Sequence, residues 1–65
     1  MTVDRNKVNL ILARKKLDVT GFCISTGFSR NRFYMILNSK NISPKTAGRI
    51  AEALEVDVAE ILEDK

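Results

Sequence analysis

The feature that most constrains the fold is a helix-start signal that recurs five times along the chain. Each signal is a small polar residue suited to the N-cap, where its side-chain oxygen accepts a backbone N–H of the first turn. An apolar residue precedes each N-cap and another follows at the spacing that lets the two side chains pack together. The five N-cap residues are Asp4, Asp18, Ser29, Ser43 and Asp57. This recurrence predicts a chain built from short helices.

The signals place five short helices near residues 4–16, 18–25, 29–38, 44–54 and 57–63. Pro44 takes the first position of the fourth helix, where its missing N–H costs nothing. No stretch alternates with the two-residue period of a β-strand. The sequence therefore predicts an all-α fold, and its 65 residues fit one domain.

Apolar residues recur at helical spacing within each predicted helix, which predicts one buried face per helix. The expected core consists of Val8, Ile11, Leu12, Phe22, Cys23, Phe33, Ile36, Leu37, Ala47, Ile50, Ala51, Leu54, Ile61 and Leu62.

The residues that are absent exclude several classes of function. Cys23 is the single cysteine, so no internal disulfide can form, and the chain contains no histidine. Histidine-based catalysis and Cys/His zinc sites are therefore excluded, and no nucleophile–base pair or phosphate-cradling glycine loop is visible. The longest apolar run, residues 10–13, is too short to span a membrane. We expect a cytoplasmic protein that is not an enzyme and uses no cofactor or metal.

Charge is divided sharply along the chain. Residues 5–49 contain ten Lys or Arg and one acid, whereas residues 50–65 contain six acids and one lysine. A basic body followed by an acidic end favours a polyanionic partner for the basic part.

Residues 18–38 carry the most informative pattern. One predicted helix ends at Thr26-Gly27-Phe28 and the next begins at once with Ser29. Gly27 can adopt the positive φ that such a tight reversal requires. Four residues before it, the small side chain of Cys23 lets the following helix cross closely. This arrangement is typical of a helix-turn-helix.

Nearly the whole chain resembles the phage repressor/Cro-type, or XRE-like, helix-turn-helix family. Residues 27–30, Gly-Phe-Ser-Arg, stand where the family has Gly-Val-Ser-Arg, and residues 38–40, Asn-Ser-Lys, resemble its Asn-Gly-Lys. Residues 50–56, Ile-Ala-Glu-Ala-Leu-Glu-Val, resemble its Ile-Ala-x-Ala-Leu-Gly-Val. The resemblance implies a sequence-specific DNA-binding transcriptional regulator, and we expect a small repressor of prokaryotic or phage type.

The chain departs from the family pattern at several positions. Val19 replaces a glutamine that touches a DNA phosphate in many members, and Gly21 lies inside the second helix. Leu12 and Leu37 occupy the positions at which some members have a buried Arg–Glu pair. Because both partners are apolar here, we expect these two leucines to touch in the core.

The resemblance also assigns roles to residues on and around the third helix, which we expect to enter the major groove. The family's base-reading positions are Arg30, Asn31 and Met35. We also expect Arg32, beside them, to contact a base or a phosphate. Arginine can bind guanine through two hydrogen bonds, and asparagine can pair with adenine. The expected phosphate-contacting residues are Ser29, Tyr34, Asn38, Lys40, Asn41 and Lys45.

A single unit of this size contacts few base pairs, so we expect a homodimer on a pseudo-palindromic operator. The expected dimer surface is the C-terminal region, with Val58, Ile61 and Leu62 as contributors, although core packing also explains the last two. Two alternatives stay open at this stage. One is the antitoxin of a toxin–antitoxin pair, and the other is a protein-interaction module that keeps the fold without binding DNA.

Overall fold

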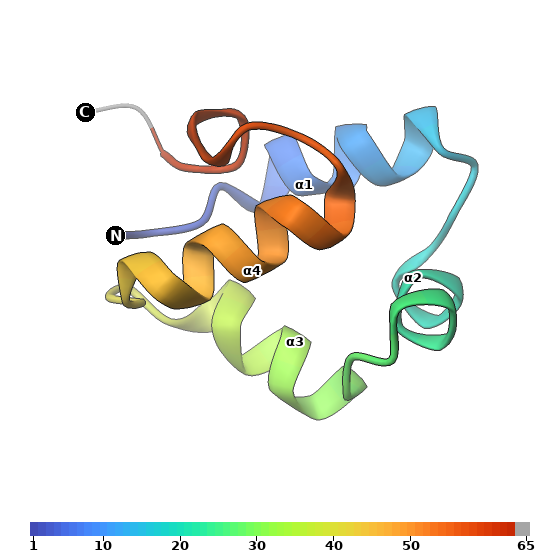
Figure 1. Cartoon of the computed structure of the whole chain (residues 1–65), viewed down its shortest axis with the longest axis horizontal. Coiled ribbons are helices and arrows are strands. Elements are labelled where there is room, and N and C mark those ends of the chain that lie inside the picture. Colours follow the sequence, from blue (N-terminus) through green and yellow to red (C-terminus); the bar gives the residue numbers. More distant parts are fainter. Residues whose placement is uncertain (64–65) are drawn as a thin grey trace.

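The computed structural model describes residues 1–63, which form four α-helices and one 3-10 turn (Figure 1). The elements are α1 (Arg5–Arg14), α2 (Val19–Thr26), α3 (Arg30–Asn38), α4 (Pro44–Leu54) and the 3-10 turn η1 (Val58–Glu60). The predicted all-α fold is confirmed, and the helix-turn-helix is the α2–α3 pair.

All five predicted N-caps are confirmed. In each, the side-chain oxygen accepts a backbone N–H two or three residues later. Asp57 and Glu60 also form the reciprocal capping box, in which the Glu60 carboxylate accepts the Asp57 N–H at 3.0 Å. The start of every element is therefore set by local side-chain chemistry.

The fifth predicted helix is wrong in length. Only Val58–Glu60 are helical, as a 3-10 turn, rather than residues 57–63. Beyond it the chain is extended, because it pairs with the N-terminal segment through the bridge between Val3 and Leu62. The N–H of Asp4 donates to the Ile61 carbonyl at 2.8 Å, and the N–H of Glu63 donates to the Thr2 carbonyl at 2.9 Å. These long-range hydrogen bonds replace the helical ones that would extend η1.

The first helix also ends earlier than expected, at Arg14 rather than residue 16. Lys16 adopts a left-handed conformation with φ of 58°, and the Leu17 N–H turns back to the Leu12 carbonyl at 2.9 Å. Glu55 ends α4 in the same way with φ of 61°. Left-handed caps at non-glycine residues carry a conformational cost.

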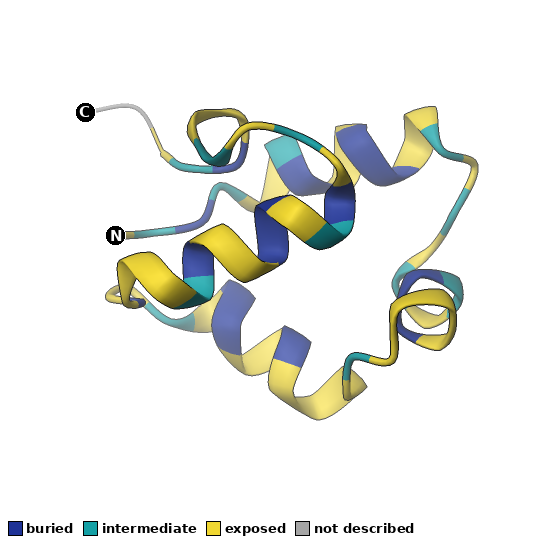
Figure 2. Cartoon of the chain, viewed as in Figure 1, coloured by how far each residue is buried: buried dark blue, intermediate teal, exposed yellow. Residues whose placement is uncertain are grey.

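Buried side chains of α1, α3 and α4 face a common core, which α2 closes from one side (Figure 2). Every expected core residue is buried except Leu62, which is half-buried. Leu12 and Leu37 are both buried in this core, and their direct contact stays a prediction. Val3 and Ile42 join the core from outside the helices.

Candidate nucleic-acid interface

The turn between α2 and α3 fixes how the two helices meet. Gly27 caps α2 with φ of 80°, the left-handed conformation predicted for it. The Phe28 ring then packs on the core, with its centroid 6.1 Å from that of Phe22 and 6.4 Å from that of Phe33. The Ser29 hydroxyl oxygen accepts the Arg32 N–H at 3.4 Å. The turn is therefore short, and the aromatic contacts of Phe28 hold the start of α3 against the core.

One side of α3 is buried and the other is open to solvent. Phe33, Ile36 and Leu37 form the buried stripe. The sequence-predicted residues on this helix are all exposed, and the Met35 side chain is 71% exposed. The exposed residues of α3 are Arg30, Asn31, Arg32, Tyr34, Met35 and Asn38. This face contains two arginines and no acid, so it presents positive charge and amide groups to solvent.

Helical spacing divides the exposed face of α3 into separate rows, because residues four apart align and residues two apart point in different directions. Asn31 and Met35 form the central row and line one shallow groove. Arg30 lies on the α2 side of this row, at a hollow shared with Ile24. Arg32 lies on the opposite side and lines a hollow beneath α4. The two arginines therefore flank the central row rather than stand together.

The groups beyond the C-terminal end of α3 are held by the N-terminal segment. The Arg5 guanidinium donates to the Asn38 side-chain oxygen at 3.1 Å. The Thr2 hydroxyl donates to the Lys40 carbonyl at 2.6 Å. The Met1 ammonium donates to the Asn41 side-chain oxygen at 3.3 Å. Three expected phosphate-contacting residues are thus tied, through side chain or backbone, to residues 1–5.

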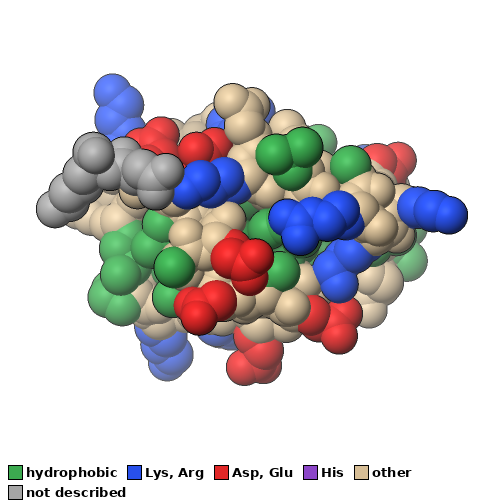
Figure 3. Space-filling model, turned by 90° about the horizontal axis from the view of Figure 1, so that it is seen from above, with side chains coloured by type: hydrophobic (Ala, Val, Ile, Leu, Met, Phe, Trp, Pro, Cys, Tyr) green, Lys and Arg blue, Asp and Glu red, His purple; other side chains and the backbone are tan. Residues whose placement is uncertain are grey.

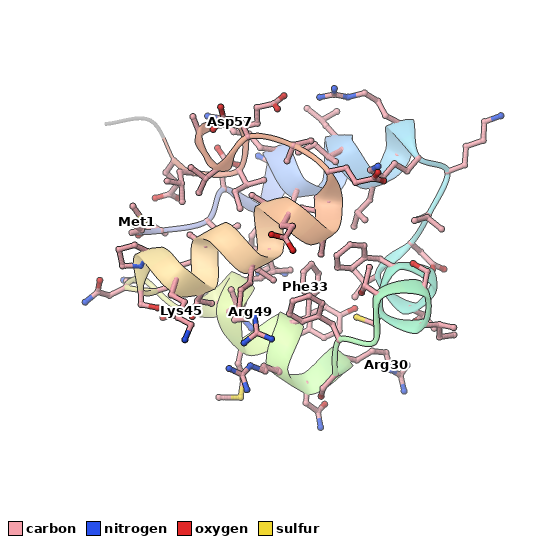
Figure 4. All side chains as sticks on the ribbon, viewed as in Figure 1. Met1, Arg30, Phe33, Lys45, Arg49 and Asp57 are labelled. Carbon is pink, nitrogen blue, oxygen red and sulfur yellow. The ribbon has the colours of Figure 1, made fainter. Side chains whose placement is uncertain are left out.

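Lys45 lies in the first turn of α4, close in sequence to the loop that follows α3. Figure 4 shows its side chain leaving α4 on the side where α3 lies. One helical turn later, Arg49 projects from α4 toward α3 (Figure 4). Sequence reasoning missed Arg49, although its spacing of four from Lys45 puts both on one row of the helix.

Val19 and Cys23 take no polar part in this surface. Val19 packs against the core as a half-buried side chain, so the phosphate-binding glutamine of the family that the sequence resembles has no counterpart here. Cys23 is buried, and burial raises the pKa of its thiol, while the nearby Arg30 charge acts in the opposite direction. A thiol with a raised pKa stays protonated at neutral pH and is a poor nucleophile.

Acidic residues collect on the other side of the molecule. The second half of α4, η1 and the segment after it carry Glu52, Glu55, Asp57, Glu60 and Glu63. Figure 3 looks down on the molecule from the side opposite α3, and acidic and basic side chains are mixed on that face. Of these acids, Glu55 forms an ion pair with Lys15 at 3.0 Å. The exposed face of α3 differs from it, because it carries two arginines and no acid.

Comparison with protein families identifies this arrangement. Residues 7–65 match the model of the Cro/C1-type HTH DNA-binding domain, so the match runs from within α1 through η1. No curated protein and no solved structure gives a significant match. Among residues 1–63, no helix has the length and apolar character needed to cross a membrane. The chain belongs to the Cro/C1-type family of helix-turn-helix DNA-binding domains.

Proposed function

We propose that the protein is a small repressor that inserts α3 into the major groove of a specific operator. The main observation in support is that Asn31 and Met35 form an exposed row along α3 and line one shallow groove. Arg30 lies beside this row, and the exposed face of α3 contains no acidic residue. Arg30 can bind guanine O6 and N7, Asn31 can bind adenine, and Met35 can pack on a thymine methyl group.

Backbone contacts to DNA set the register of the helix in the groove. We assign these contacts to Ser29, Tyr34, Asn38, Lys40, Asn41 and Lys45. The supporting observation is that each of these side chains is exposed, on α3, in the loop that follows it or, for Lys45, in the first turn of α4. The Ser29 N–H and hydroxyl lie at the N-terminus of α3, where the helix dipole favours an anion.

The test is selection of DNA from a random duplex pool, followed by affinity measurements at several salt concentrations. A repressor of this kind enriches one motif, and its affinity falls with a log–log slope of about −0.9 for each phosphate contact. Absence of any enriched motif would contradict sequence-specific binding and favour the protein-interaction alternative.

We further propose that two copies bind a pseudo-palindromic site with half-sites one helical turn apart. The C-terminal region lies away from α3 (Figure 1) and remains the proposed dimer surface. Of the three expected contributors, Ile61 is fully buried in the core, while Val58 and Leu62 are half-buried. Because so little apolar surface is left there, we expect dimerisation to require DNA. An inverted repeat in the selected motif, with a monomer in sedimentation experiments without DNA, is the expected result.

A repressor acts where its operator lies. For a prokaryotic or phage genome that compartment is the cytoplasm, which is the location we propose.

A further inference from the structure

A hollow between α3 and α4 is lined by residues that suit an anion-binding site. Its walls come from the α2–α3 turn, the inner edge of α3 and the first two turns of α4, and its charged lining residues are Arg32 and Arg49. Figure 4 shows Arg49 pointing from α4 toward α3. Two cationic side chains from different helices therefore converge on one space.

Neither arginine has a counter-charge in the structure. Within residues 1–63, no carboxylate lies within ion-pair distance of Arg32 or Arg49. Like charges that share a hollow repel each other, and an anion placed between them removes that repulsion. Guanidinium groups also suit phosphate, because their planar N–H donors match two of its oxygens.

Two hydroxyl groups at the same hollow have unused donors. The Ser29 oxygen accepts the Arg32 N–H, and the Thr46 oxygen accepts the Ser43 hydroxyl at 3.0 Å. In the described chain neither Ser29 nor Thr46 donates its own O–H proton to another group. Both protons are therefore available to an oxygen of a ligand in the hollow.

The hollow is continuous with the central row of α3. Ser29, Arg32, Ile36 and Thr46 line both the hollow and the shallow groove that contains Asn31 and Met35. An extended polyanion lying along this groove thus passes beside the two guanidinium groups when α3 faces its bases.

We propose that the Arg32–Arg49 hollow seats one backbone phosphate of the DNA strand that borders the major groove. The proposal rests on the proposed function and deepens it, because it assigns Arg49 to binding and gives Arg32 a phosphate rather than a base. A phosphate bound by Arg49 of α4 would fix the distance between the DNA backbone and α3.

The experiment compares the wild type with Arg49→Gln and Arg32→Gln on the selected duplex and on a random duplex. Arg14→Gln is the matched control, an exposed arginine in the last turn of α1. Because both arginines bind the same phosphate, the Arg32→Gln/Arg49→Gln double variant is expected to reduce the salt slope by about 0.9 on both duplexes, and each single variant by less, without changing the preferred motif. Thermal unfolding checks that the variants stay folded.

Duplexes with a single uncharged methylphosphonate then locate the phosphate. One position should weaken binding by the wild type and the Arg14→Gln variant, weaken binding by each single hollow variant less, and leave the double variant unaffected, because only the double variant has lost the whole contact. A slope for Arg49→Gln equal to that of Arg14→Gln overturns the proposal, as does an affinity loss confined to the selected duplex.

A free anion is the other source of the same chemistry, and inorganic phosphate is its probe. Amide shifts of Ser29 and Thr46 on phosphate titration, with no methylphosphonate position coupled to Arg49, would overturn the DNA proposal in favour of a free-anion site. The slope on random duplex does not depend on base reading. The phosphate seat can therefore be supported even if no motif is enriched and the proposed repressor function fails.

Discussion

The two ends of α3 are built in opposite ways. At the N-terminal end, Gly27 and Ser29 set the backbone locally, and the side chains of Arg30 and Asn31 make no hydrogen bond or ion pair within residues 1–63. At the C-terminal end, Asn38, Lys40 and Asn41 are held by residues that lie 33 to 40 positions away in the chain. Under the proposed function, this difference predicts that the free end reads bases and that the tethered end binds phosphate through its backbone.

The largest effect should come from the free end. Arg30→Ala is expected to weaken binding to the preferred duplex by about 1–3 kcal/mol, roughly 5- to 150-fold, and to relax the preference at one base pair. Folding stability should change by no more than about 0.5 kcal/mol, because the side chain is exposed. Affinity measurements on the preferred site and its single-base variants check this. An equal loss on all sequences would show that Arg30 binds phosphate instead.

Substitution of Gly27 tests whether the N-terminal end of α3 is set by the local backbone conformation of the turn. Gly27→Ala should destabilise the fold by about 1–2 kcal/mol, because alanine is strained at φ of 80°. Apart from the adjoining residues of the chain, no atom lies within 4 Å of an added Cβ, so the cost comes from the backbone conformation and not from a clash with the rest of the fold. Gly48→Ala is the matched control: it also has open space around the added Cβ but lies in α4, and it should gain about 0.5–1 kcal/mol. Denaturant unfolding of both variants measures the contrast, and a destabilised Gly48→Ala variant would contradict the explanation.

The same comparison explains what the sequence could and could not predict. Caps and turns depend on residues within four positions, so Gly27, Ser29 and the other N-caps were predictable from local chemistry. The bracing of Asn38 by Arg5 and the short η1 turn depend on residues 1–5 meeting distant segments, which no local pattern reveals. The position of Arg32 was partly predictable. Residues two apart on a helix point in different directions, so the sequence already indicates that Arg30 and Arg32 lie on different sides of α3.

A smaller effect is expected at the tethered end. Thr2→Val removes the hydroxyl that donates to the Lys40 carbonyl at 2.6 Å while keeping the shape of the side chain. The fold should lose about 0.5–1 kcal/mol, in the range of a single hydrogen bond. DNA affinity should fall slightly and equally on all sequences. Thr20→Val is the control, because Thr20 is exposed on α2 and its hydroxyl makes no hydrogen bond within residues 1–63. Equal behaviour of the two variants would show that the tether contributes nothing.

The smallest effect is expected at Lys40, where the side-chain charge can be removed without removing the backbone carbonyl that binds Thr2. Lys40→Ala keeps the backbone carbonyl that Thr2 binds and removes only the exposed ammonium group. If that group contacts one phosphate, the log–log salt slope should fall by about 0.9. The loss of affinity between 50 and 200 mM salt would then be roughly 3.5-fold smaller for the variant than for the wild type. Lys16→Ala is the control, since α1 ends at the opposite end of the long axis from the loop after α3 (Figure 1). A slope unchanged by Lys40→Ala but reduced by Thr2→Val would mean that the tethered end acts through its backbone N–H groups rather than through its lysine.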